Sequence, residues 1–131
     1  MADSQYFKKI IDAIVVQARG FLEEMGEFYP FGTMIDANGK IYPMGIFIED
    51  DNPPSNILIE MLEKQIVEGI TSGVYIMGSI GIDIYLNPEN GKKDNAIEIR
   101  TLMQGKDNWG YVYLPYNIEN KKVLFGEFKS F

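Results

Sequence analysis

The stretch Val74-Tyr75-Ile76-Met77-Gly78-Ser79-Ile80-Gly81-Ile82-Asp83-Ile84-Tyr85-Leu86 has the strongest strand pattern in the chain and decides its fold class. Its even-numbered positions are aliphatic except at Gly78, whereas its odd-numbered positions mix tyrosine, methionine, serine, glycine and aspartate. Because successive side chains of a strand point to opposite faces, one face is aliphatic and the other is mixed. This alternation is typical of an antiparallel sheet covered on one side. We expect Gly78 and Gly81 to mark a bulge or a bend in so long a strand.

Two amphipathic helices are predicted, over residues 4–25 and 55–72. In the first, apolar residues recur at alternating steps of four and three, and Gly26 is expected to be its left-handed C-cap. In the second, Ser55 or Asn52 is the candidate N-cap. The apolar stripe of the first helix is predicted to be Phe7, Ile11, Ile14, Ala18, Phe21 and Met25, widened by Ile10, Val15 and Leu22. The buried stripe of the second is predicted to be Leu58, Met61, Leu62, Ile66 and Ile70.

The remaining strands are predicted on either side of the second helix. The first two, residues 27–35 and 40–48, flank an Asp36-Ala37-Asn38-Gly39 turn that favours a hairpin. Three more strands, residues 94–103, 111–116 and 122–128, follow the central one. Short turns require antiparallel neighbours, so we expect one α+β domain over residues 1–131. Its order is α-β-β-α-β-β-β-β, with a single antiparallel sheet and both helices packed on the one aliphatic face.

Composition excludes several kinds of chemistry. The 131 residues contain no cysteine and no histidine, which removes the thiolate nucleophile, the imidazole base and the usual zinc ligands. The formal net charge is -7 and the pI is near 4.5, which disfavours nucleic acid and anionic membranes as partners. The charge is uneven, because residues 1–72 carry 5 basic and 12 acidic side chains and residues 73–131 carry 7 of each.

No targeting or ligand-binding motif is evident in the sequence. The start lacks the basic region of a signal peptide, and no apolar run approaches a membrane span, so we expect a cytoplasmic protein. The acidic loop Glu49-Asp50-Asp51 is the densest charge cluster, but it lacks the EF-hand spacing. A solvated loop before a helix explains these acids without a ligand, and we expect neither a metal nor a cofactor.

One group of polar residues suggests a cleft on the sheet. Asp94, Glu98 and Arg100 share a face of their strand, and Asp83 and Tyr85 lie on the polar face of the preceding one. If the two strands pair, these groups could share one surface. Glu98 would then be an acid or base and Arg100 an anion clamp. The alternative is a set of cross-strand ion pairs on a solvated face.

Aromatic residues gather at two places, around Pro30 and around Pro115. Phe28, Tyr29 and Phe31 surround the first proline, and Trp109, Tyr111, Tyr113 and Tyr116 surround the second. Tyr111 and Tyr113 share a face, and Tyr116 lies on the opposite one. Such side chains are enriched among interface anchors, although core packing explains them equally well. The candidate binding surface comprises Tyr75, Asp83, Tyr85, Glu98, Arg100, Tyr111 and Tyr113.

Three short motifs carry a family resemblance. They are Glu27-Phe28-Tyr29-Pro30-Phe31-Gly32, Asp94-Asn95-Ala96-Ile97-Glu98-Ile99 and Val112-Tyr113-Leu114-Pro115-Tyr116. With its opening helix, the chain resembles a group of small, uncharacterised bacterial α+β proteins. The resemblance implies no activity, and only an analogy links such acidic proteins to immunity proteins that neutralise a toxin.

Two functions from different classes are therefore expected. The leading one is a non-enzymatic, immunity-like protein-binding module with a basic partner, because acidic faces steer basic proteins and no catalytic residue can be named. The alternative is a small-molecule-binding or enzymatic domain that uses the carboxylate, arginine and tyrosine patch. That alternative requires an enclosed pocket and a strongly shifted carboxylate pKa. Self-association through an exposed face is a third possibility.

Overall fold

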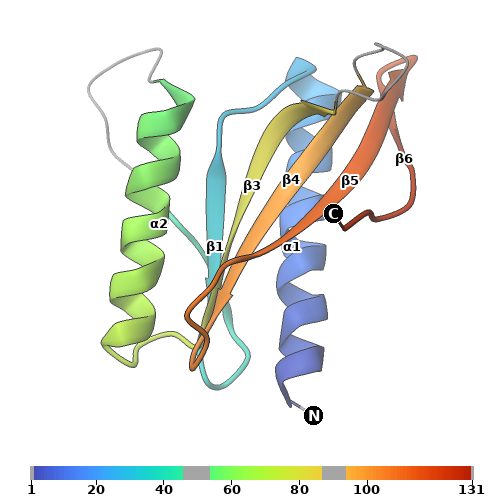
Figure 1. Ribbon diagram of the computed structural model, residues 1–131. Helices are drawn as coiled ribbons and strands as arrows, with labels where there is room; N and C mark the ends of the chain where they lie inside the picture. The colour runs from blue at the N-terminus through green and yellow to red at the C-terminus, as the bar shows by residue number, and fades with distance from the viewer. Residues whose placement is uncertain (1, 46–53, 87–93, 131) are drawn as a thin grey trace.

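The computed structural model describes residues 2–45, 54–86 and 94–130 (Figure 1). It confirms the α+β class and the predicted order of elements. These elements are α1 (Ala2–Met25), β1 (Phe31–Ile35), β2 (Ile41–Pro43), α2 (Ser55–Thr71), β3 (Met77–Leu86), β4 (Asp94–Met103), β5 (Gly110–Glu119) and β6 (Lys122–Phe125).

The sheet is antiparallel throughout, in the strand order β2-β1-β3-β4-β5-β6. The longest ladder joins β3 to β4, and its register pairs Ser79 with Thr101 and Asp83 with Ile97. Beyond β6 the chain stays beside β5, where Lys129 and Tyr113 exchange two backbone hydrogen bonds of 2.7 and 2.8 Å. The stretch with the strongest strand pattern in the sequence contains β3, and β3 lies between β1 and β4 in the sheet.

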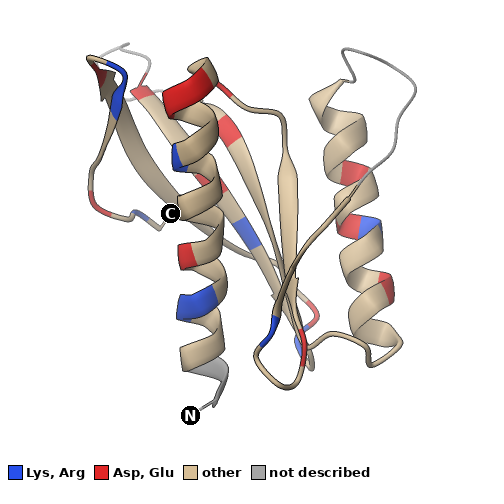
Figure 2. Cartoon of the chain, turned by 180° about the vertical axis from the view of Figure 1, so that it is seen from behind, with Lys and Arg blue, Asp and Glu red and all other residues tan. Residues whose placement is uncertain are grey.

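The two helices lie on opposite faces of the sheet, so the expectation that both cover one face is wrong. Figure 1 shows α1 behind β4 and β5 and α2 to the left of β1, and the reversed view of Figure 2 brings α1 in front of the strands. A Cβ built on Gly81 would lie 2.9 Å from Cγ2 of Ile14 in α1. A Cβ built on Gly78, on the other face, would lie 2.6 Å from Cγ2 of Ile66 in α2.

Each face of the sheet therefore has its own apolar core. The mixed face of β3 is not solvated, because Met77, Ser79 and Gly81 are small or apolar enough to admit α1. The α1 side buries Ile10, Ile11, Ile14, Ala18, Leu22, Ile35, Met77, Ile97, Ile99, Leu114, Tyr116 and Val123. The α2 side buries Met34, Leu62, Ile66, Ile80, Ile82 and Leu102.

A row of small polar side chains crosses the sheet beneath α1. Ser79 pairs in register with Thr33 on one side and Thr101 on the other, and all three are buried. The Ser79 hydroxyl lies 2.9 Å from Oγ1 of Thr101, and Gln17 of α1 donates a 2.8 Å hydrogen bond to Thr33. Burial of these hydroxyls is tolerated because their hydrogen bonds are made inside the protein.

Glycine in β3 has a different role from the one expected. The ladder between β3 and β4 continues without interruption across Gly78 and Gly81, so neither residue marks a bulge. Instead, each lacks the side chain that would collide with an isoleucine of the covering helix. Close helix-to-sheet packing, rather than strand curvature, accounts for both glycines.

The ends of the elements agree with the sequence in part. Gly26 has a φ of +80° and donates its N–H to Leu22, which confirms the C-cap of α1. Pro54 occupies the N-cap of α2 and makes no side-chain hydrogen bond, so Ser55 is not the cap, and Asn52 lies outside the described residues. The 36–39 turn is confirmed, with Gly39 at a φ of +83°.

The strands flanking this turn are shorter than predicted. β1 begins at Phe31 rather than at residue 27, after the buried Pro30, which has no N–H for a ladder. β2 spans only Ile41–Pro43, and the predicted segment 46–48 lies outside the described residues. As a result residues 26–30 form an irregular connection between α1 and β1, and this connection carries much of the site described next.

Candidate functional site

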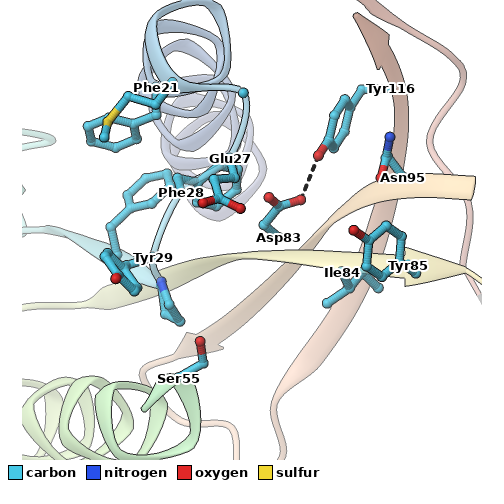
Figure 3. Close-up of a pocket in the computed structure, with 14 residues that line it drawn as sticks. Phe21, Glu27, Phe28, Tyr29, Ser55, Asp83, Ile84, Tyr85, Asn95 and Tyr116 are labelled. Atoms are coloured by element: carbon cyan, nitrogen blue, oxygen red, sulfur yellow. Dashed lines mark hydrogen bonds between the residues drawn. The ribbon is translucent and has the colours of Figure 1, made fainter. Parts of the chain in front are cut away.

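The main pocket has a volume of about 630 Å³ and opens where α1 ends (Figure 3). The 26–30 connection forms one wall, and the first residue of α2, the end of β3 and single residues of β4 and β5 complete it. Its lining is Phe21, Met25, Gly26, Glu27, Phe28, Tyr29, Pro30, Phe31, Ser55, Asp83, Ile84, Tyr85, Asn95 and Tyr116. The volume lies within the range typical of ligand-binding clefts.

Three phenylalanines build the apolar wall of this pocket. Phe31 lies edge-on to both Phe21 and Phe28, with ring centroids 5.4 and 5.3 Å apart, and Phe21 and Phe28 are 6.2 Å apart. Edge-to-face contacts of this kind fix the rings relative to one another. The wall forms because Gly26 turns the chain back from α1, which places residues 28–31 against the last turns of that helix.

Asp83 and Tyr116 form the polar floor. The Tyr116 hydroxyl donates a 2.6 Å hydrogen bond to Oδ1 of Asp83, as the dashed line in Figure 3 shows. Burial raises the pKa of the Asp83 carboxyl, and the charge of Glu27 adds to the rise, whereas hydrogen bonds from Tyr116 and from the backbone of Phe28 oppose it. Burial, followed by the hydrogen bond to Asp83, raises the pKa of the Tyr116 phenol.

The charges around the pocket have one sign. Glu27 and Asp83 carry carboxylates into the lining, and no lysine or arginine is among the described residues that form it. Tyr29 is 52% exposed and Phe21 is 37% exposed, so aromatic surface stands open to solvent beside these acids. Aromatic faces and carboxylates both attract organic cations, which makes a cationic group the best match to this pocket.

The polar patch predicted from the sequence does not exist as one surface. Asp83 pairs with Ile97, one residue before Glu98, so the register places Asp83 and Glu98 on opposite faces of the sheet. Of the seven predicted site residues, Asp83 and Tyr85 line the pocket on the α1 side. Glu98, Arg100, Tyr111 and Tyr113 lie together on the α2 side.

On the α2 side the charged groups compensate one another. Arg100 contacts Glu98 at 3.0 Å and Glu63 of α2 at 3.5 Å, and its guanidinium lies 5.3 Å from the ring centroid of Tyr111. The Tyr113 hydroxyl donates a 3.1 Å hydrogen bond to Glu98. Burial first, and then the charge of Glu98, raises the pKa of Tyr113. This arrangement ties α2 to β4 and β5, but its ion pairs run within β4 and to α2 rather than between strands, and they lie on a face that α2 covers.

Tyr75 belongs to neither group. Its ring packs edge-on against Tyr42, with centroids 5.5 Å apart, and it lies against the core beneath α2. It also lines a second pocket of about 510 Å³ between β2 and the end of α2. The structure thus divides the predicted surface into three separate places.

Several pocket residues were missed or only partly anticipated. The sequence predicts an aromatic cluster of Phe28, Tyr29 and Phe31 around Pro30, and this cluster lies at the site. Tyr116 was correctly placed on the face opposite to Tyr113, yet its bond to Asp83 spans 33 residues and depends on the β3–β4–β5 registers. For Glu27, Ser55 and Asn95 the sequence contains no signal that we recognise.

Comparison with models of protein families, with curated proteins and with solved structures finds no significant match to this chain. The described part of the chain contains no helix long and apolar enough to cross a membrane. Within residues 2–45, 54–86 and 94–130, no group of three or more acids is placed to hold a metal ion. The acidic loop at residues 49–51 lies outside those ranges.

Proposed function

We propose that this chain is a non-enzymatic, immunity-like binding module that acts in the cytoplasm and binds a basic protein partner. The observation that carries the proposal is the aromatic pocket, which presents Glu27 and Asp83 and has no cation among its described lining residues. Interfaces are anchored by a few side chains inserted into such desolvated pockets. A basic partner supplies side chains of the matching charge.

The distribution of charge supports the same conclusion. The whole surplus of seven negative charges falls in residues 1–72, which include α1, the 26–30 connection and α2. These elements meet at the pocket. A negative field around a binding site accelerates association with a positively charged protein, and this acceleration decreases as the ionic strength rises.

A differential capture experiment tests the proposal. The intact protein and the variants Asp83→Asn and Tyr29→Ala are immobilised in equal amounts and exposed to a native lysate at low and moderate salt. Glu119→Gln, an exposed acid on β5 that does not line the pocket, is the matched control. We expect the wild type and the control to retain a basic protein. The amount retained should be lower at moderate salt than at low salt, and lower on both pocket variants than on the wild type. Equal retention on all four proteins contradicts the proposal.

A small-molecule-binding domain is the second candidate function, favoured by the pocket volume of about 630 Å³. It differs from the sequence-based alternative because it uses the Asp83 side of the sheet rather than Glu98 and Arg100. A thermal-shift screen of small organic cations, compared between the wild type and Tyr29→Ala, tests it. Stabilisation of the wild type alone favours this candidate, and no stabilisation by any compound counts against it.

A further inference from the structure

We propose that the pocket between α1 and β3 holds the guanidinium group of an arginine side chain from the protein partner. This inference rests on the proposed function and deepens it, because it names the chemical group that the partner must present. It assigns one role to the aromatic wall and another to the carboxylates. Figure 3 shows both sets of side chains around the same space.

The aromatic wall provides flat surfaces for stacking. Tyr85, Tyr29 and Phe21 are the most exposed rings of the lining, and Phe28 and Phe31 hold the wall in place through contacts of 5.3 to 6.2 Å. A planar guanidinium stacks on such faces and is attracted by their negative quadrupole. The attraction is stronger where water is partly excluded, as it is inside a pocket.

The carboxylates supply the counter-charge. Asp83 is half buried and is held by the Tyr116 hydroxyl at 2.6 Å, so its position does not depend on a bound ligand. A carboxylate has about four acceptor positions, and the hydrogen bonds from Tyr116 and the Phe28 backbone occupy two of them. A bound guanidinium can use the others and offsets the cost of keeping this carboxylate charged in a half-buried place.

Arginine fits these features better than lysine does. The guanidinium is planar and more weakly hydrated than an ammonium, and its five donors can serve Asp83 and Glu27 together. The pocket also has room for the aliphatic stem, which can lie against Pro30 and the phenylalanine wall. An ammonium would leave the flat aromatic surfaces without a planar partner.

The test uses peptides of one design. Each is a capped nine-residue glycine and serine chain with arginine, lysine or neutral citrulline at its centre, and free arginine is the fourth probe. Each probe is titrated into the isotope-labelled full chain, and backbone amide shifts are followed. We expect the arginine peptide to shift Glu27, Tyr29 and Ser55 and to leave Tyr111 unchanged.

The affinities decide the result. The arginine peptide is expected to bind at least about tenfold more tightly than the citrulline peptide, which lacks the charge. Asp83→Asn keeps an oxygen for Tyr116 but removes the charge, so it should weaken arginine binding about tenfold. Tyr29→Ala removes a half-exposed ring of the wall and should also weaken it. Glu119→Gln should bind as the wild type does.

Four outcomes overturn the inference. They are shifts outside the pocket, equal binding of arginine and citrulline peptides, tighter binding of the lysine peptide, and free arginine that binds as tightly as the peptide. The last outcome would identify a free small molecule as the ligand. If the arginine peptide fails while a basic protein is still captured through the pocket in a salt-sensitive way, only this inference is wrong. If no basic protein is captured, the proposed function itself fails.

Discussion

Gly78 and Gly81 are three residues apart on β3, and each lies directly beneath an isoleucine of a different helix. The Cβ position of Gly78 is 2.6 Å from Ile66 of α2, and that of Gly81 is 2.9 Å from Ile14 of α1. Because both distances are shorter than real Cβ contacts, the helices approach the sheet as closely as the absence of a side chain permits. The two glycines of β3 therefore set how closely α1 and α2 pack on the two faces of the sheet.

Replacement of either glycine by alanine is expected to lower the free energy of unfolding by about 1–3 kcal/mol, because the added methyl group overpacks the core. In urea denaturation, Ile66→Ala should cost less in the Gly78→Ala background than in the wild type, since the smaller side chain leaves room for the methyl group. Strictly additive effects would contradict this contact. Gly20→Ala is the control, because no atom lies within 4 Å of its Cβ position, and it should stabilise α1 by about 0.5–1 kcal/mol.

Tyr116→Phe is expected to reduce stability at pH 7 by about 1 kcal/mol, because Asp83 loses its hydrogen-bond donor. The cost should shrink at alkaline pH. The pKa of Tyr116 is raised above 10.0 in the folded protein, so above about pH 10 the unfolded state releases a proton that the folded state retains. That difference destabilises the wild type as pH rises, and phenylalanine abolishes it. Urea midpoints of the wild type and the variant, measured at pH 7 and about pH 10.5, test this expectation. A difference between the two proteins that is the same at both pH values would contradict it.

Asp83→Asn is expected to alter the acid side of the pH profile. Burial raises the pKa of Asp83 above 3.8 in the folded protein, so in the window above 3.8 the folded state binds more protons than the unfolded state does. The contribution of Asp83 to stability therefore rises as pH falls through that window and is unfavourable at neutral pH. The free energy of unfolding of the wild type minus that of the variant should increase from pH 7 to about pH 4. A decrease over this range would show that the sign is wrong.

Arg100→Ala is expected to destabilise the protein by about 1–2 kcal/mol, because Glu98, whose side chain is 14% exposed, keeps Tyr113 but loses its cation. Glu63→Gln removes only the longer and more exposed contact at 3.5 Å, so its cost should be at most about 0.5 kcal/mol. Thermal unfolding of the two variants in parallel measures the ranking. Equal costs would mean that the contact between α2 and β4 matters as much as the pair within β4.

The sequence predicts the elements of this fold well, because each depends on a local period. Alternation predicts the β4 boundaries at Asp94 and Met103. The glycine that follows the helical stripe predicts the C-cap at Gly26, where φ is positive. Helix placement does not follow in this way. Ser79 and Gly81 look like a mixed, solvated face when read along one strand, and only the presence of α1 above them shows that small size is what matters.

The candidate site was predicted only in fragments for a similar reason. Alternation correctly separates Tyr116 from Tyr113, but the relation between strands depends on register, and a shift of one residue reverses every face. Asp83 and Glu98 each lie on the polar side of their own strand, which predicts a shared surface, yet the observed pairing of Asp83 with Ile97 separates them. The pocket also needs the irregular 26–30 connection, which no periodic pattern describes.

The hydrogen bond from the backbone N–H of Val123 to the Glu23 carboxylate, 3.0 Å long, has a kinetic consequence. It joins residues 100 positions apart and links α1 to β6. During synthesis β1 follows α1 directly, but β3, β4 and β6, on which α1 also packs, emerge later, so part of its apolar stripe stays exposed to water until then. Domains that depend on such distant contacts fold more slowly than helical bundles of similar size. A transient companion that shields Ile10, Ile14 and Leu22 during that interval would raise the yield of folded protein.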